Sequence, residues 1–376
     1  MTNIQRRKFL KYTGGSVALT GLAGCSGGGG SEETTEAGET TASEGETTAS
    51  GGSGGDTINV GMVYALGGLG DKSFNDMAHR GVKQAAEKYD VEFQNAEPSG
   101  PSDFKTLQQR FAQSTSPDYD LICCIGFAQT SALKETAKQF PDQNFMLVDS
   151  TVDSDNVASY VFKEHEGSFQ IGHLAGQITK MGFEAGAGKT NDAGKIGFVG
   201  GLEIPLIKKF QAGYMAGNKY AHEDNEVTAA YVGSWTDPAK GKEIALSMYD
   251  DGADIVYHGA GASGIGAFKA AQERGRFAVG VDADQSKSAS EYKDVILASM
   301  VKRVDQAVAT AVENVVNGSF KGGQINALGL EKNGVQPVLG QQLGSSVPDD
   351  VTAALEESRK AIIDGDITVP TKPGDV

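Results

Sequence analysis

Residues 58–81 read INVGMVYALGGLGDKSFNDMAHRG and join an apolar run to a pattern typical of a helix. The run 58–64 has the length and composition of a buried strand, and from Phe74 onward apolar residues recur at helical spacing. A strand that leads through a turn into a helix is the repeating unit of a parallel α/β sheet. The turn at 66–73 contains three glycines. Glycine at this density indicates that a ligand approaches the backbone closely.

The alternation of strand and helix continues along the chain and then starts again. In the first series, strands are predicted at 58–64, 91–96, 121–127, 144–150 and 157–162, with helices at 74–89, 103–115 and 130–139. In the second, strands are predicted at 195–201, 227–234, 254–261 and 277–284, with helices at 205–222, 238–251 and 263–274. About 320 residues exceed one comfortable core. The sequence therefore predicts an α/β protein whose two lobes repeat the same half.

The first 25 residues have the pattern of an export signal. They contain no acidic residue, place Arg6 and Arg7 before an apolar stretch at 17–23, and end in LAGC. The paired arginines favour the twin-arginine route, and Cys25 is the predicted acceptor of a lipid anchor. We expect a protein anchored by lipid at the cell surface, on the extracytoplasmic face of the membrane.

Residues 26–56 are rich in Gly, Ser, Thr and Glu and are predicted to form a flexible acidic tether. The whole chain has a formal net charge of −16, which argues against nucleic acid as a partner and favours a halophilic source. Cys123 and Cys124 are expected in a buried strand rather than in a redox site. The five histidines are scattered, so no metal site and no cofactor are predicted.

Candidate binding residues follow the predicted strands, because ligands of open parallel sheets bind at the carboxyl ends of the strands. These positions hold aromatic and acidic side chains and few basic ones: Asp71, Phe74, Asn75, Phe127 and Asp149 in the first series, and Phe210, Trp235, Gly261, Asp282 and Lys302 in the second. Carboxylates and amides suit sugar hydroxyls, and aromatic faces suit a flat heterocycle. A phosphate would require more basic groups. The mixture predicts an uncharged sugar joined to a base.

Each candidate also has a structural alternative. Phe74 and Phe210 could be core residues, and Asp149 and Asp282 could be helix caps. The stretch GFEAGAGKT at 182–190 resembles a phosphate-binding loop, but its spacing is wrong for that motif. We interpret it as a surface connection between the lobes.

Several motifs together resemble the basic membrane protein (BMP) family of lipoproteins, which are similar to purine-nucleoside receptors. They are GGLGDKSFND, VDS, FKEHEGSFQIGHLAG, GGLEIPLIKKFQAGYMAG, GASGIGAFKAA, GVDADQ and ILASMVKRVDQAV, spread over residues 57 to about 320. The resemblance implies a type I periplasmic-binding-protein fold, with two Rossmann-like lobes joined by a three-segment hinge. It places 57–163 and 303–325 in the N-terminal lobe and 164–302 and 326–376 in the C-terminal lobe.

The resemblance also implies a function and residue roles. It indicates a receptor that captures a nucleoside, with a purine base favoured, and delivers it to the permease and ATPase subunits of an ABC transporter. Phe74 and Phe210 would stack on the base, Asn75 and Asp149 would bind its polar edges, Asp282 and Lys302 would hold the ribose, and Gly261 would admit the ligand to the backbone.

Other readings remain open. Relatives thought to take flavins leave riboflavin as an alternative ligand, and a sugar is another. An enzyme that cleaves nucleosides would need a metal cluster or a positioned base, and the sequence offers no motif for either. A sensor ectodomain would need a spanning helix of its own or a signalling partner, and no run of 18 apolar residues is present. We therefore expect a binding protein rather than an enzyme.

Overall fold

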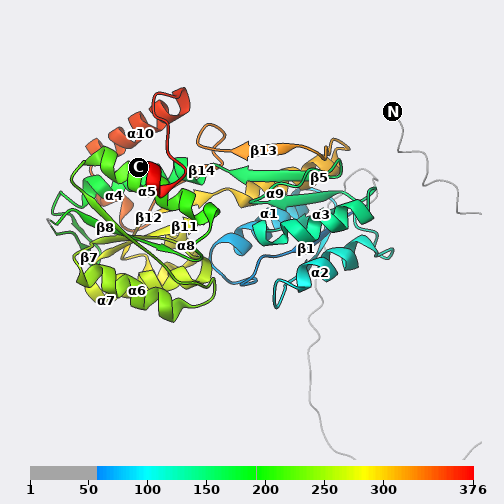
Figure 1. Ribbon diagram of the computed structural model, residues 1–376, viewed down its shortest axis with the longest axis horizontal. Helices are drawn as coiled ribbons and strands as arrows, with labels where there is room; N and C mark the ends of the chain where they lie inside the picture. Colours follow the sequence, from blue (N-terminus) through cyan, green and yellow to red (C-terminus); the bar gives the residue numbers. More distant parts are fainter. Residues whose placement is uncertain (1–56, 192) are drawn as a thin grey trace, which may run out of the picture. The chain divides into compact units, whose positions relative to one another are not determined.

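The computed structural model describes residues 57–191 and 193–376 (Figure 1). The predicted signal 1–25 with Cys25 and the predicted tether 26–56 lie outside the described residues. Everything below concerns the described part of the chain.

The first lobe is built on a six-stranded parallel sheet with the order β13-β5-β4-β3-β1-β2. Its strands are β1 (Ile58–Val63), β2 (Val91–Ala96), β3 (Leu121–Cys124), β4 (Phe145–Val148), β5 (Val157–Phe162) and β13 (Ile325–Leu328). Its helices are α1 (Phe74–Lys88), α2 (Asp103–Ala112), α3 (Thr130–Gln139) and α9 (Val304–Val316). Helix α1 packs with α9, and α2 packs with α3.

The two adjacent cysteines show how this sheet is buried on both faces. Cys123 belongs to the apolar cluster that includes Met77 of α1, whereas Cys124 belongs to the cluster that includes Phe104 of α2. Successive residues of a strand point to opposite faces, so one thiol enters each layer. Both are free and fully buried, as predicted. Burial raises the pKa of each thiol, which leaves both cysteines unreactive.

The second lobe contains a six-stranded sheet with the order β14-β12-β11-β10-β8-β9, in which only the β12–β14 pairing is antiparallel. Its strands are β8 (Lys195–Gly200), β9 (Glu226–Tyr231), β10 (Ile255–Gly259), β11 (Phe277–Asp282), β12 (Ile296–Lys302) and β14 (Val335–Leu339). Its helices are α4 (Glu164–Ile178), α5 (Pro205–Ala221), α6 (Pro238–Asp250), α7 (Ile265–Arg274), α8 (Gln285–Ser288) and α10 (Asp349–Asp364). Helix α7 begins two residues later than predicted, because a 3-10 turn occupies Gly261–Gly264.

The same strand order occurs in both sheets when each is numbered from its own first strand: 2-1-3-4-5, followed by one further strand. This doubly wound order leaves a crevice at the carboxyl ends of the strands where the order reverses. The predicted repetition of one α/β half is confirmed.

The chain passes between the sheets three times: after β5, after β12 and after β13. The predicted return segment 303–325 ends three residues too early, because β13 continues in the first sheet to Leu328. We propose that these three passages form the hinge.

Helices α4 and α5 approach each other very closely. A Cβ atom on Gly172 of α4 would overlap the backbone of Tyr214, and one on Gly217 of α5 would overlap the backbone of Phe169. Glycine at these positions therefore lets the two helix backbones touch. The contact fixes α5, which carries Phe210, against α4, which begins at the first passage between the lobes.

The segment 182–190 lies within the second lobe and does not connect the lobes, which corrects our interpretation. It contains the hairpin β6 (Glu184–Ala185) and β7 (Gly188–Lys189), and the backbone N–H of Lys189 donates to the Gly275 carbonyl before β11. The segment follows α4, which the resemblance had already placed in the second lobe with the rest of 164–302.

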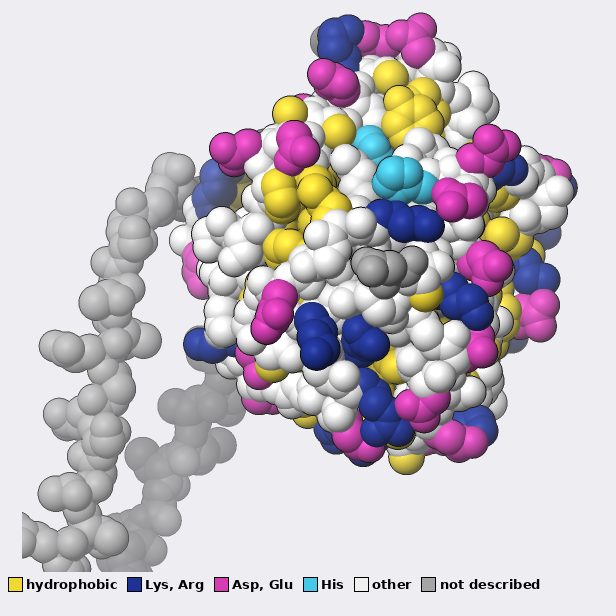
Figure 2. All heavy atoms as spheres, turned by 90° about the vertical axis from the view of Figure 1, so that its left-hand side faces the viewer, with side chains coloured by type: hydrophobic (Ala, Val, Ile, Leu, Met, Phe, Trp, Pro, Cys, Tyr) yellow, Lys and Arg dark blue, Asp and Glu magenta, His cyan; other side chains and the backbone are white. Residues whose placement is uncertain are grey.

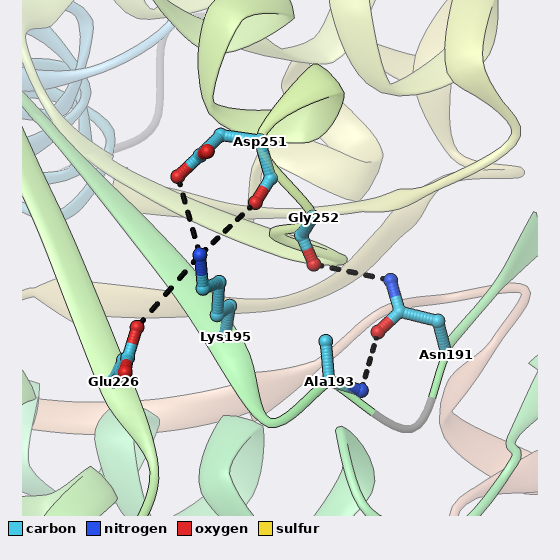
Figure 3. Close-up of polar contacts among 6 residues, drawn as sticks. All are labelled: Asn191, Ala193, Lys195, Glu226, Asp251 and Gly252. Carbon is cyan, nitrogen blue, oxygen red and sulfur yellow. Dashed lines mark hydrogen bonds and ion pairs between the residues drawn. The ribbon is translucent and has the colours of Figure 1, made fainter.

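Asn191 and Lys195, which follow this hairpin, form polar contacts at the amino end of the same sheet (Figure 3). Lys195 forms ion pairs with Glu226 and Asp251 at 3.8 and 3.4 Å, and the Asn191 amide donates to the Gly252 carbonyl. This end is opposite to the carboxyl ends that face the first lobe. On the surface of the second lobe that Figure 2 shows, basic and acidic side chains are interspersed.

Candidate ligand-binding site

One cavity lies between the carboxyl ends of the two sheets and contains about 750 Å³ of empty space, including its mouth. All ten residues predicted from the sequence line it: Asp71, Phe74, Asn75, Phe127, Asp149, Phe210, Trp235, Gly261, Asp282 and Lys302. Residues far apart in the chain thus meet where the strand order predicted.

The glycine-rich turn forms the edge of the cavity on the first lobe. Gly67, Gly68 and Gly70 have φ values of +104°, +65° and +89°, which side chains rarely permit. Gly67 itself lines the cavity. The path of the backbone at the edge of the cavity therefore requires these glycines.

Asp71 shapes the start of α1. Its carboxylate accepts hydrogen bonds from the backbone N–H groups of Ser73 at 2.9 Å, Asn75 at 2.8 Å and Asp76 at 3.2 Å. Burial raises the pKa of Asp71 to about 6, although these N–H groups oppose the shift. The carboxylate thus holds the turn that presents Phe74 and Asn75 to the cavity, which is a structural role in addition to the predicted one.

Lys302 lies at the end of β12 and is almost completely buried. Its ammonium Nζ is 2.6 Å from Asp149 Oδ1 and 3.4 Å from Glu164 Oε1. Burial alone would lower the pKa of Lys302, but the carboxylates of Asp149, Glu164 and Asp282 outweigh it and raise the pKa above its usual value. Lys302 is therefore charged at any physiological pH.

Two strand-end aspartates carry unusual backbone conformations. Asp149 after β4 and Asp282 at the end of β11 have φ values of +67° and +62°. Among the described residues, just two other non-glycine residues, Lys72 and Asn333, have positive φ. Such strain persists where the surrounding structure imposes it, often at ligand sites. The two aspartates occupy equivalent positions in the two lobes. Each lies at the carboxyl end of the fourth strand, counted along the chain, of its own sheet.

Asp282 is buried, although it still contributes to the lining of the cavity. Its Oδ2 atom accepts a hydrogen bond of 2.6 Å from the Ser73 hydroxyl. Burial raises the pKa of Asp282 to about 6, while Lys302 and the Ser73 hydroxyl act in the opposite direction. The Asp282 carboxylate is thus a hydrogen-bond acceptor. Because its pKa is about 6, modest changes in its surroundings can change its charge.

Aromatic rings lie around the Lys302 ammonium. Lys302 Nζ lies 5.1 Å from the centroid of the half-buried Phe74 ring and 5.7 Å from that of the buried Phe210 ring. Trp235 is half-buried and packs over Gly201, where a Cβ atom would overlap its indole. A Cβ atom on Gly261, which has φ +56°, would lie in ordinary van der Waals contact with Trp235. The lining of the cavity thus combines aromatic rings with the charged side chains around Lys302.

The sequence reasoning missed several contributors. Apolar lining comes from Ala65, Leu66, Leu206, Ile207 and Val281. Glu164 does not line the cavity, but it is completely buried beside Lys302, and neither of its carboxylate oxygens has a hydrogen-bond partner. Burial raises the pKa of Glu164, and Lys302 opposes that shift. A signal for Glu164 was available, since it stands two residues after the end of β5.

Residues 57–191 and 193–376 contain no group of three or more potential metal-binding side chains. None of their helices combines the length and apolar character needed to cross a bilayer.

Comparison with known proteins extends these observations. The family model described as "ABC transporter substrate-binding protein PnrA-like" matches residues 58–372. An uncharacterized lipoprotein of Pyrococcus abyssi is 36% identical over 85% of this chain and 74% of its own length. A protein named ABC transporter nucleoside-binding protein BmpA, from Lactococcus lactis, is 32% identical over 84% of this chain and 90% of its own length.

A solved structure is also similar. It is a solute-binding protein of an ABC transporter system from Aeropyrum pernix, which matches with a TM-score of 0.73 and 31% identity. The match covers 84% of this chain and 93% of that one. The two-lobed α/β architecture is therefore that of type I periplasmic solute-binding proteins, as expected.

Proposed function

Because this chain belongs to the PnrA-like family of ABC transporter substrate-binding proteins, we propose that it captures a nucleoside between its two lobes. The observation that carries the proposal is the meeting of aromatic and acidic residues of both lobes around one cavity. The name of the Lactococcus lactis relative supports the same ligand class.

The geometry supports a specific arrangement. The Phe74 and Phe210 rings would stack on the base, and the Asn75 amide would bind its polar edge. Lys302 and Asp282 would hold the ribose hydroxyls, since a carboxylate accepts and an ammonium donates. Asp149 would bind the base while it also fixes Lys302, 2.6 Å away.

The charge of the cavity favours an uncharged ligand. Among its described lining residues, Asp71, Asp149 and Asp282 are acidic and Lys302 is basic. The Lys302 ammonium is already paired with Asp149. A phosphate would meet an acidic surface with no free cation, so a nucleoside should bind better than its 5′-monophosphate.

The remaining parts of the proposal concern location and delivery. We infer that twin-arginine export and a lipid on Cys25 hold the protein at the extracytoplasmic face of the membrane. The sequence pattern at 1–25 and the lipoprotein name of the Pyrococcus abyssi relative support this. From there the protein would deliver its ligand to the permease and ATPase subunits of an ABC importer.

Calorimetric titration of the purified protein tests the ligand class. The panel is inosine, guanosine, adenosine, inosine 5′-monophosphate, riboflavin and ribose. We expect the nucleosides to bind, with purine nucleosides binding most tightly, and the monophosphate and free ribose to bind weakly. Tight binding of ribose or riboflavin without binding of any nucleoside would contradict the proposal and leave a sugar or flavin receptor.

A further inference from the structure

A short turn of the first lobe, residues 71–73, docks onto the second lobe beside the cavity. The Lys72 side chain is exposed, but its carbonyl oxygen accepts two hydrogen bonds from α8: one of 3.2 Å from Gln285 Nε2 and one of 2.9 Å from the Ser288 hydroxyl. Lys72 has φ +59°, which costs energy in a residue with a side chain. The strained backbone aims the carbonyl at α8. We call these two hydrogen bonds the interlobe latch.

The orientation of the Gln285 amide is fixed within the second lobe. Its Oε1 atom accepts a hydrogen bond of 2.8 Å from the backbone N–H of Val281. A backbone N–H can only donate, so the amide oxygen must face Val281 and the amide nitrogen must face Lys72. This assignment does not depend on the first lobe.

His258 supports the same orientation. Its Nε2 atom lies 2.8 Å from Gln285 Oε1, which can only accept, so Nε2 must carry the proton. The Nδ1 atom is then the unprotonated one, in agreement with its lack of any hydrogen-bond partner. A buried histidine thus serves to hold one amide.

Gln285 and His258 are both completely buried, and neither lines the cavity. A buried polar pair is costly unless its hydrogen bonds are made. The Nε2 donor of Gln285 finds its acceptor, the Lys72 carbonyl, on the other lobe. If the lobes separate, that donor loses this partner, so the contact favours the closed arrangement.

We propose that Gln285, oriented by His258, is a positioning residue that stabilises the closed state through the interlobe latch without touching the ligand. The latch also holds the turn in front of Phe74 and Asn75 against the second lobe. The proposal rests on the proposed function for what is bound, but the latch does not depend on which ligand that is. Because apparent affinity scales with the fraction of binding-competent protein, loss of the latch should weaken every ligand by the same factor.

The test uses variants of the full chain. Ser288→Ala removes one latch hydrogen bond from a partly exposed residue, and Ser288→Thr keeps the hydroxyl. Gln285→Leu removes the other donor. Lys287→Ala is the matched control, because this exposed residue of the same helix pairs with Asp284 of its own lobe.

We expect Ser288→Ala to weaken binding of each ligand about two- to tenfold, the size of one hydrogen bond, through faster dissociation. Gln285→Leu should weaken binding at least as much. The melting temperature of ligand-free Ser288→Ala should match that of the parent, Ser288→Thr should restore affinity, and Lys287→Ala should bind normally. Small-angle scattering of ligand-free Gln285→Leu should give a larger radius of gyration than that of Lys287→Ala.

Unchanged affinity in Ser288→Ala and Gln285→Leu, together with an unchanged radius of gyration, would overturn the latch. A loss that differs tenfold between inosine and adenosine would also overturn it and make Gln285 a specificity residue. If no nucleoside binds the parent, the proposed function fails. The scattering comparison then decides the latch alone, since it needs no ligand.

Discussion

Replacing Lys302 by methionine should destabilise the ligand-free protein in a way that depends on pH. The substitution keeps most of the volume of the side chain but removes the ammonium, which lies 2.6 Å from Asp149 and 3.4 Å from Glu164. Breaking a buried ion pair on one side costs about 3–5 kcal/mol, because a charge is left without compensation.

Protonation of the unpaired carboxylate sets an upper limit on that cost. A carboxylate left without its cation can take up a proton instead of remaining charged, and each pH unit above the usual carboxylate pKa of about 4 costs about 1.4 kcal/mol. The limit for neutralising one carboxylate is therefore about 4 kcal/mol at pH 7 and about 1.5 kcal/mol at pH 5. We expect the free energy of unfolding to fall by about 3–4 kcal/mol at pH 7 and by less than half of that at pH 5.

Urea denaturation of parent and variant at both pH values measures the effect. The control is Lys360→Met on α10, where an exposed lysine pairs with Asp364, and no measurable change is expected at either pH. An equal loss in Lys302→Met at pH 5 and pH 7 would contradict this expectation, since it would show that Lys302 contributes by packing rather than by charge.

Three further predictions concern binding, pH and anchoring. Phe210→Ala should weaken nucleoside binding about tenfold to a hundredfold, as loss of a stacked ring does, whereas Phe104→Ala in the core of the first lobe should lower stability and leave affinity unchanged in calorimetry. Burial raises the pKa of Asp254 to about 6. Proton binding to Asp254 therefore stabilises the folded state, and this contribution to the free energy of unfolding is lost as pH rises from about 4 to 6. Between pH 4.5 and 7, Asp254→Asn should therefore lose less unfolding free energy than the parent, and equal losses would exclude the shift. Cys25→Ser should abolish lipid attachment, measured as the mass of membrane-extracted protein, and a parent that retains residues 1–24 unmodified would rule out the anchor.

Much of the fold follows from the sequence, because its signals are local. The apolar runs at β1, β3, β4 and β11 are buried on both faces of parallel sheets, so they appear as continuous apolar segments. β13 and β14 were not predicted, since they are edge strands whose residues, apart from Val335, are exposed or half-buried and form no continuous apolar run. The helix α10 was not predicted either.

The order of strands and helices along the chain also predicts which residues meet at the cavity. Parallel strands place all their carboxyl ends at one edge, so a residue's place after a strand fixes its place in space. Asp149 and Asp282 could be named in this way without knowledge of any contact. Their left-handed backbone could not, because it depends on what packs around them.

Contacts between residues that are far apart in the sequence depend on how the two lobes pack together. Glu164 is 138 residues from Lys302, and Lys72 is 213 residues from Gln285. The local pattern does not show which partners these side chains contact, since periodicity reports which face of an element is buried and not what it is buried against. The charge balance around Lys302 and the docking of the 71–73 turn on α8 arise when two separately wound lobes come together, and that step is set by packing rather than by local propensity.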